Sequence, residues 1–173
     1  LQGDWSSDVC SSDLPPVGFF KEFGGFKGHV DRWHYYNLHL PSTAVIDFGS
    51  VATEENCAEE DRDKGVRVFA LHFVTPVNEH YTIDHWMHLR NSAKGQDSAS
   101  QKIDGLLEMA FQEDKAILEA IHKSEQRAQP RKPVRIAIDK GPNVYRKRIR
   151  DLVEAESTEH LGDPIAPAFV YKD

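Results

Sequence analysis

The sequence predicts a single α+β domain in which antiparallel strands come first and helices follow. Three observations favour this class. Runs rich in aromatic and β-branched residues fill the chain between positions 30 and 90, a long stretch after position 98 has helical periodicity, and strands do not alternate with helices. With 173 residues, of which 39% are hydrophobic, the chain is long enough to bury one core.

Composition also excludes several functions. A net charge of −7 gives no electrostatic case for binding nucleic acid. No run of about 18 apolar residues is present, so no membrane-spanning helix is expected. Two cysteines, Cys10 and Cys57, do not make a disulfide framework, which favours a reducing compartment and hence the cytoplasm.

We expect residues 1–14 to take no part in the fold. One encoding of "DWSSDVCSSDL" reads in frame through a common sequencing-adapter oligonucleotide, and the alternative is a disordered leader rich in Ser and Asp. The genuine chain would then begin near Pro15, in residues 15–173, and would be truncated at its N-terminal side.

The first half of residues 15–173 is expected to hold two strands between loops. The Gly- and Phe-rich segment 15–28 predicts a loop over apolar surface. Strands are expected near 31–40 and 43–52, separated by a break at Pro41. The acidic segment 53–65 predicts an exposed loop.

A hairpin and a long helix follow. Strands are expected at about 66–75 and 80–90, joined by a turn at "PVNE". The helix is expected over about 99–127, with Ser98 or Ser100 as its N-cap.

The C-terminal part is expected to be simpler. "QPRKP" ends the long helix, and a short extended piece is expected at 134–138. A second helix begins near Pro142 or Asn143, and the tail from Gly162 is rich in proline.

Asp114 interrupts the apolar stripe of the long helix. At about 100° per residue, Asp114 falls near the middle of that stripe and Glu113 at its edge. A carboxylate on a buried face needs a partner, which can be an arginine, the backbone or a metal ion. The apolar residues that form the stripe are Ile103, Leu106, Leu107, Ala110, Phe111, Ile117, Leu118 and Ile121.

His72 is the histidine most firmly placed by the strand pattern. Both faces of "VRVFALHFV" are apolar, so this strand is expected to be covered on both sides and His72 to be buried or to line a pocket. The alternative is a core histidine bonded to backbone. Regular alternation sends His85 and His88 to opposite faces, so only one of them can point inward.

Four stretches occur in an order that resembles the C-terminal catalytic domain of Rieske non-haem iron oxygenases, in the branch of vanillate O-demethylase and dicamba monooxygenase. The resemblance covers nearly all of residues 15–173. The stretches are "GHVDRWHYYNLHLPSTAVIDFG", "LHFVTPVNEHYTIDHWMHLRN", "AFQEDKAILEAIH" and the late "D…YRKRIRDLVEAE".

The resemblance implies a fold and a set of site residues. The fold is a curved antiparallel sheet wrapped around a long helix, the helix-grip arrangement of START-like domains. Asp114 would ligate a mononuclear iron, and His72 would face the substrate. Asp47 and Phe48 are weaker candidates for contacting substrate. The family's two iron-binding histidines and its Rieske domain would lie upstream of this chain.

The implied reaction of the intact protein is monooxygenation, by O-demethylation or hydroxylation of a small aromatic acid. It would use mononuclear Fe(II), a [2Fe-2S] Rieske cluster, dioxygen and electrons from NAD(P)H through a separate reductase, in a homotrimer. This chain alone would then be inactive and would lack stoichiometric iron.

Two other functions remain open from the sequence. One is a non-catalytic ligand-binding domain of the same shape, in which Asp114 forms a salt bridge. The other is a cupin-like metal enzyme that uses His72, His80 and His85, which would require a closed β-barrel and no long helix.

Overall fold

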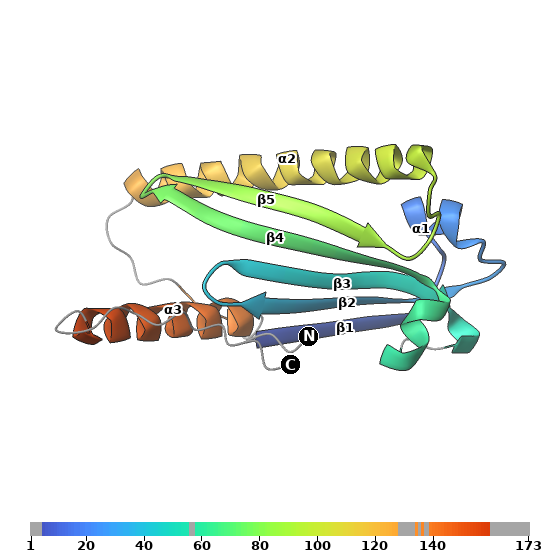
Figure 1. The fold of residues 1–173 in the computed structure, drawn as a ribbon, viewed down its shortest axis with the longest axis horizontal. Helices are drawn as coiled ribbons and strands as arrows, with labels where there is room; N and C mark the ends of the chain where they lie inside the picture. Colours follow the sequence, from blue (N-terminus) through green and yellow to red (C-terminus); the bar gives the residue numbers. More distant parts are fainter. Residues whose placement is uncertain (1–4, 56–57, 128–133, 135, 137–138, 160–173) are drawn as a thin grey trace.

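The chain folds as a five-stranded antiparallel sheet with helices, as the predicted α+β class requires (Figure 1). The computed structural model describes residues 5–55, 58–127, 134, 136 and 139–159. Each strand pairs with the next along the chain, so the sheet is a meander. The strands are β1 (Trp5–Leu14), β2 (Val30–His39), β3 (Thr43–Ala52), β4 (Val66–Asn78) and β5 (Tyr81–Arg90).

The two predicted strand pairs are confirmed, and only the hairpin turn differs. β4 continues through the predicted "PVNE" turn as far as Asn78, and Pro76 lies opposite Thr82 of β5. The pairing of β4 with β3 ends at Phe73. Pro76 therefore lies where β4 has a neighbour on one side only, so the missing N–H of proline removes no bond to β3.

β1 differs from the expectation that residues 1–14 add no element. Its backbone pairs with β2, with Cys10 opposite Trp33, and the side chains from Cys10 to Asp13 are exposed. Main-chain groups make the bonds of a sheet ladder, so an open edge can accept a strand of almost any sequence. The pairing therefore does not bear on the origin of these residues, and the adapter interpretation stays a prediction.

The segment predicted as a loop over 15–28 contains a short helix, α1 (Gly18–Gly24). Phe19 and Phe23 lie one helical turn apart with ring centroids separated by 4.8 Å. Phe19 is buried in the core. Gly25 ends the helix with a φ of 62°, the left-handed conformation that glycine adopts without strain. Packing of aromatic rings thus orders a segment whose glycines suggested a loop.

The acidic segment 53–65 is also more ordered than predicted. It contains two 3₁₀ helices, η1 (Thr53–Glu55) and η2 (Glu59–Lys64). Arg62 of η2 is buried rather than exposed, because it reaches a carboxylate on β3.

The two long helices are confirmed as α2 (Asp97–Arg127) and α3 (Lys140–Glu159). α2 begins one residue before the nearer of the two predicted caps. Pro142 lies in the first turn of α3, where no N–H is required for helical bonding. The predicted extended piece at 134–138 lies largely outside the described residues, and the tail from Gly162 lies wholly outside them.

The buried core lies at one end of the sheet, where α1 and the start of α2 meet β4. From there α2 runs along β4 and β5 (Figure 1). In the described part of the chain, no helix is long and apolar enough to cross a membrane. This core cluster consists of Phe19, Val66, Val68, Ala99 and Ile103. Further buried apolar side chains lie along the strands: Val30, Trp33, Val45, Val51 and Ala70.

Candidate functional site between β4, β5 and α2

A group of polar and aromatic side chains lies on the side of β4 and β5 that faces α2. His72 is directly opposite Trp86 in the ladder, and alternation places His88 on the same face. Phe111 of α2 contacts all three rings, with centroid distances of 5.3 Å to His72, 5.1 Å to Trp86 and 6.3 Å to His88. This ring forms the link between the helix and the sheet at the candidate site.

His72 lies where the strand pattern predicted it, with 12% of its side chain exposed. Its Nδ1 is 2.8 Å from Oδ2 of Asp84, on the neighbouring strand β5. The partner is a carboxylate and not the backbone carbonyl of the alternative interpretation. Because Asp84 accepts from the Nδ1–H, the Nε2 atom of His72 remains for another contact.

His88 is the inward-facing member of the pair His85 and His88, which the sequence could not decide. Both of its ring nitrogens are buried, and neither has a hydrogen-bond partner among the described residues. Burial lowers the pKa of His88 below its ordinary value, and the nearby His72 lowers that pKa further, while Asp104 acts in the opposite direction. The sequence signal that could have identified His88 is that it follows Trp86 by two residues, which places both side chains on the same face of the strand.

Asp114 does not lie in the dry surroundings that the helical stripe predicted. It is exposed, as is Glu113. The buried part of the stripe ends near Phe111, and beyond it Ile117 and Leu118 are 59% and 65% exposed. Asp114 follows Phe111 by three residues, so the two lie on the same side of α2, one turn apart.

Phe48 and Asp47 lie on opposite faces of β3. Phe48 is on the face that carries His72, where it packs against His34 and Phe20. Asp47 is on the far face and is 5% exposed. Adjacent residues on a strand point to opposite sides, so the two cannot both contact one substrate. Phe48 is the better placed of the two candidates.

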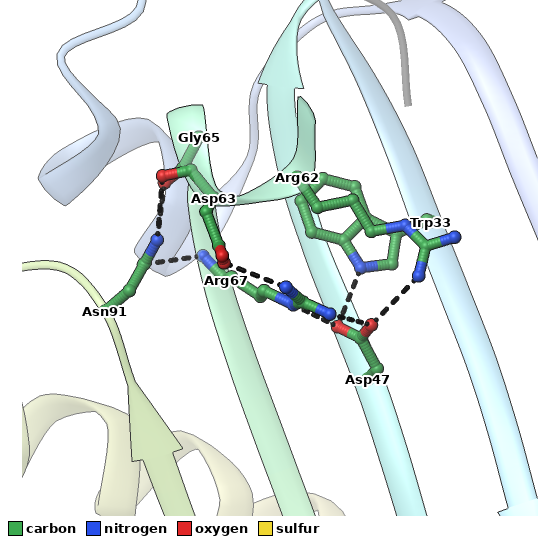
Figure 2. A network of polar contacts seen from close by, with 7 residues as sticks. All are labelled: Trp33, Asp47, Arg62, Asp63, Gly65, Arg67 and Asn91. Carbon is green, nitrogen blue, oxygen red and sulfur yellow. Dashed lines mark hydrogen bonds and ion pairs between the residues drawn. The ribbon is translucent and has the colours of Figure 1, made fainter. Parts of the chain in front are cut away.

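The carboxylate of Asp47 is the centre of a buried network (Figure 2). Arg67 donates to both of its oxygens, at 3.0 Å and 2.8 Å, while Trp33 donates at 3.0 Å and Arg62 at 3.1 Å. Burial alone would raise the pKa of Asp47, but hydrogen bonds from Arg67, Trp33 and Arg62 outweigh it and lower that pKa. This geometry favours a structural role for Asp47.

Asn91 extends the network along the chain. Its Oδ1 accepts from the backbone N–H of Arg67 at 2.8 Å, and its Nδ2 donates to the carbonyl of Gly65 at 3.0 Å. These bonds attach the end of β5 to the start of β4 and to the end of η2. The network thus stabilises the core end of the sheet on the face opposite the candidate site.

The histidines of the cupin-like interpretation do not converge. His80 lies in the β4–β5 turn beside His122 of α2, with ring centroids 5.7 Å apart. His85 is on the face of β5 opposite His72, and the sheet is open rather than closed. Among the described residues, no group of three His, Cys, Asp or Glu side chains is placed to hold a metal ion. Asp114 offers one carboxylate, so the described residues do not by themselves fit a complete iron site.

An open antiparallel sheet with a long helix along β4 and β5, and a polar and aromatic cluster between them, places the chain in the α+β class. Residues 8–155 match the family model described as the vanillate O-demethylase oxygenase C-terminal domain. The chain belongs to this family.

Two relatives and one solved structure agree with this assignment. The toluene-4-sulfonate monooxygenase system iron-sulfur subunit of Comamonas testosteroni is 31% identical over 134 residues, which are 76% of this chain and 38% of that protein. A second such subunit of the same organism matches to the same extent. The crystal structure of apo dicamba monooxygenase superposes with a TM-score of 0.65 at 20% identity, over 91% of this chain and 49% of that one. This chain therefore spans well under half the length of the two relatives.

Proposed function

We propose that this chain is the C-terminal part of the catalytic domain of a Rieske-type oxygenase that acts on a small aromatic acid. The observation that carries the proposal is the family match over residues 8–155. The names of the relatives favour an oxygenase over a non-catalytic binding domain. The reaction would be monooxygenation, by hydroxylation or O-demethylation, in a cytoplasmic homotrimer.

In this proposal, dioxygen activation and electron transfer depend mainly on cofactors that the described residues do not hold by themselves. A mononuclear iron and a [2Fe-2S] cluster would supply dioxygen activation and electron transfer, with a reductase that uses NAD(P)H as the electron source. In this chain, Asp114 would contribute one carboxylate to the iron. His72 would hold the substrate, and Phe48, Trp86 and Phe111 would provide apolar contacts that exclude water.

The role of Asp114 is tested by Asp114→Ala in the full-length protein. We expect mononuclear iron per subunit to fall by at least about tenfold, because loss of one of three ligands weakens a metal site severely. The visible absorbance of the cluster and the melting temperature should stay unchanged, since Asp114 is exposed on α2.

Glu113→Ala is the matched control, because Glu113 is the adjacent exposed carboxylate on the same helix. It should leave iron content and turnover near normal. If Asp114→Ala retains its mononuclear iron, or if Glu113→Ala is the variant that loses it, the assignment of Asp114 is wrong.

The role of His72 is tested by His72→Ala in the same protein. Loss of an imidazole that contacts substrate should weaken substrate binding by about tenfold while iron content stays normal. His85→Ala, on the opposite face of β5, should leave substrate binding unchanged. Equal affinities in the wild type and His72→Ala would rule out this role.

A further inference from the structure

His88 holds two buried hydrogen-bonding atoms that no described residue satisfies. Its Nδ1 and Nε2 are both covered, and neither has a partner in the described part of the chain. The ring packs against Trp86 at 5.0 Å and against Phe111 at 6.3 Å. A buried polar group without a hydrogen bond is energetically unfavourable, so a group from outside that completes these bonds would bind favourably.

We propose that His88 is a second substrate-contacting residue beside His72, and that it hydrogen-bonds a hydroxyl group on the aromatic ring of the substrate. The inference rests on the proposed function, because it takes the substrate to be aromatic. It adds a residue and a chemical group that the resemblance does not assign.

The aromatic neighbours show that this face of β4 and β5 packs against a flat ring, which in the structure is that of Phe111. Phe111 lies against His72, Trp86 and His88 at centroid separations of 5.1–6.3 Å, the range that aromatic pairs prefer. A substrate ring that takes the place of Phe111 between α2 and β5 would meet the same three faces. Its ring substituent would then lie within reach of the nitrogens of His88.

The charges around His88 favour a neutral hydroxyl over a second anionic group. The carboxylate of Asp84 binds His72 on the same face, and Asp104 on α2 is close enough to act on His88. Both would repel a carboxylate or sulfonate. Arg90, two residues along the same strand face, already donates to the carbonyls of Ala93 and Gln96.

Hydrogen-bond chemistry leads to the same group. A neutral imidazole has one donor and one acceptor, and a hydroxyl can bond to either nitrogen because it both donates and accepts. A carboxylate only accepts, so it could use only the protonated nitrogen. Burial lowers the pKa of His88 and so favours this neutral form near pH 7.

The experiment compares 4-hydroxybenzoate with benzoate, which differ only in the ring hydroxyl, on the 173-residue chain. Dissociation constants and the side-chain ¹⁵N shifts of the histidines are measured by NMR. We expect 4-hydroxybenzoate to bind about tenfold more tightly, because benzoate leaves the His88 bond unmade. The nitrogens of His88 should shift with 4-hydroxybenzoate and much less with benzoate.

Variants connect the preference to the residue. His88→Phe keeps a ring against Trp86 and Phe111 but removes both nitrogens, so the two ligands should bind within about twofold of each other. His88→Gln keeps a donor and an acceptor and should retain part of the preference. His85→Phe, the matched change on the opposite face of β5, should retain all of it.

The inference is overturned if benzoate binds as well as 4-hydroxybenzoate, if neither ligand binds, or if His88→Phe keeps the preference. Its failure is separable from failure of the proposed function. If Asp114→Ala loses its mononuclear iron as expected but the 173-residue chain does not prefer 4-hydroxybenzoate, only the role of His88 is wrong. If the chain prefers 4-hydroxybenzoate but the full-length protein binds no mononuclear iron, the proposed oxygenase function is wrong and the role of His88 stands.

Discussion

At the scale of single residues, the hydrogen-bond network around Asp47 is expected to contribute strongly to the free energy of unfolding. One buried carboxylate satisfies donors from β2, η2 and β4. Asp47→Asn would leave Arg62 and Arg67 close together with a neutral partner. We expect the free energy of unfolding to fall by about 3 kcal/mol, since breaking a buried ion pair leaves a charge uncompensated. Urea unfolding measures this loss.

Asp63→Asn is the control for that variant. Asp63 also pairs with Arg67, at 2.8 Å, but its side chain is 75% exposed. Exposed ion pairs contribute less than about 1 kcal/mol. A loss in Asp63→Asn as large as that in Asp47→Asn would show that burial does not decide the strength of this network.

The same carboxylate predicts a pH dependence. The pKa of Asp47 is lower in the folded chain than its ordinary value, so the unfolded chain binds the proton more tightly. The stabilisation is therefore fully present above the unfolded pKa of about 4 and is lost as pH falls through the folded pKa. The difference in urea midpoint between wild type and Asp47→Asn should be constant from pH 5 to 7 and should shrink below about pH 4. A difference that grows on acidification would contradict this sign.

At the scale of elements, β1 is the strand that the rest of the sheet needs least. Among the strands it pairs only with β2, although it also contacts α3 and Asp13 pairs with His29, and its side chains from Cys10 to Asp13 are exposed. We expect a chain without residues 1–14 to remain folded. In hydrogen exchange, the β2 amides that face β1 should lose protection, while the amides of β3 and β4 should keep theirs.

Protection of the central strands is the internal control of that experiment. If the shortened chain exchanges all its amides at the unfolded rate, β1 is integral to the fold, and the adapter interpretation of residues 1–14 loses its support.

At the scale of the whole molecule, the apolar surface exceeds what the described fold covers. Along α2, Leu106, Met109, Ile117, Leu118 and Ile121 are all exposed. Exposed apolar side chains gathered on one side of a helix mark an interaction surface or promote association, even though Asp114 interrupts this stripe. We therefore expect the 173-residue chain to self-associate at high concentration, and Ile117→Glu to reduce that association by several-fold in analytical ultracentrifugation.

Lys115→Gln is the matched control. It changes the net charge by the same −1 but lies on the opposite, polar side of α2, where its contact with Glu119 is a long surface pair at 3.9 Å. If both variants reduce association equally, net charge and not the apolar stripe is responsible. If neither does, the stripe is not the contact surface.

Much of the fold was predictable from local sequence. The periods of 2 and 3.6 residues located four strands and both long helices within a few residues of their observed ends. The errors fell where a tertiary contact orders a polar or glycine-rich segment. Phe19 and Phe23 form a helix because they reach the core, and Arg62 orders η2 because it reaches Asp47.

The candidate site was predictable only in part. The place of His72 on β4 and the position of Asp114 on α2 followed from pattern and resemblance. The proximity of His72 to Asp84 and the inward direction of His88 depend on the register between β4 and β5. A strand pattern separates two faces, but it does not say which face another element will cover.

The sequence by itself determined the family, the order of strands and helices and the apolar stripe of α2. Each of these depends only on local periodicity or on the order of motifs along the chain. Only the tertiary structure decided that Asp47 and Phe48 serve opposite faces, that Asp114 is exposed and that both ring nitrogens of His88 are buried without a partner among the described residues. The physical reason is that burial and pairing are properties of segments far apart in the chain. They arise when register and packing bring those segments together.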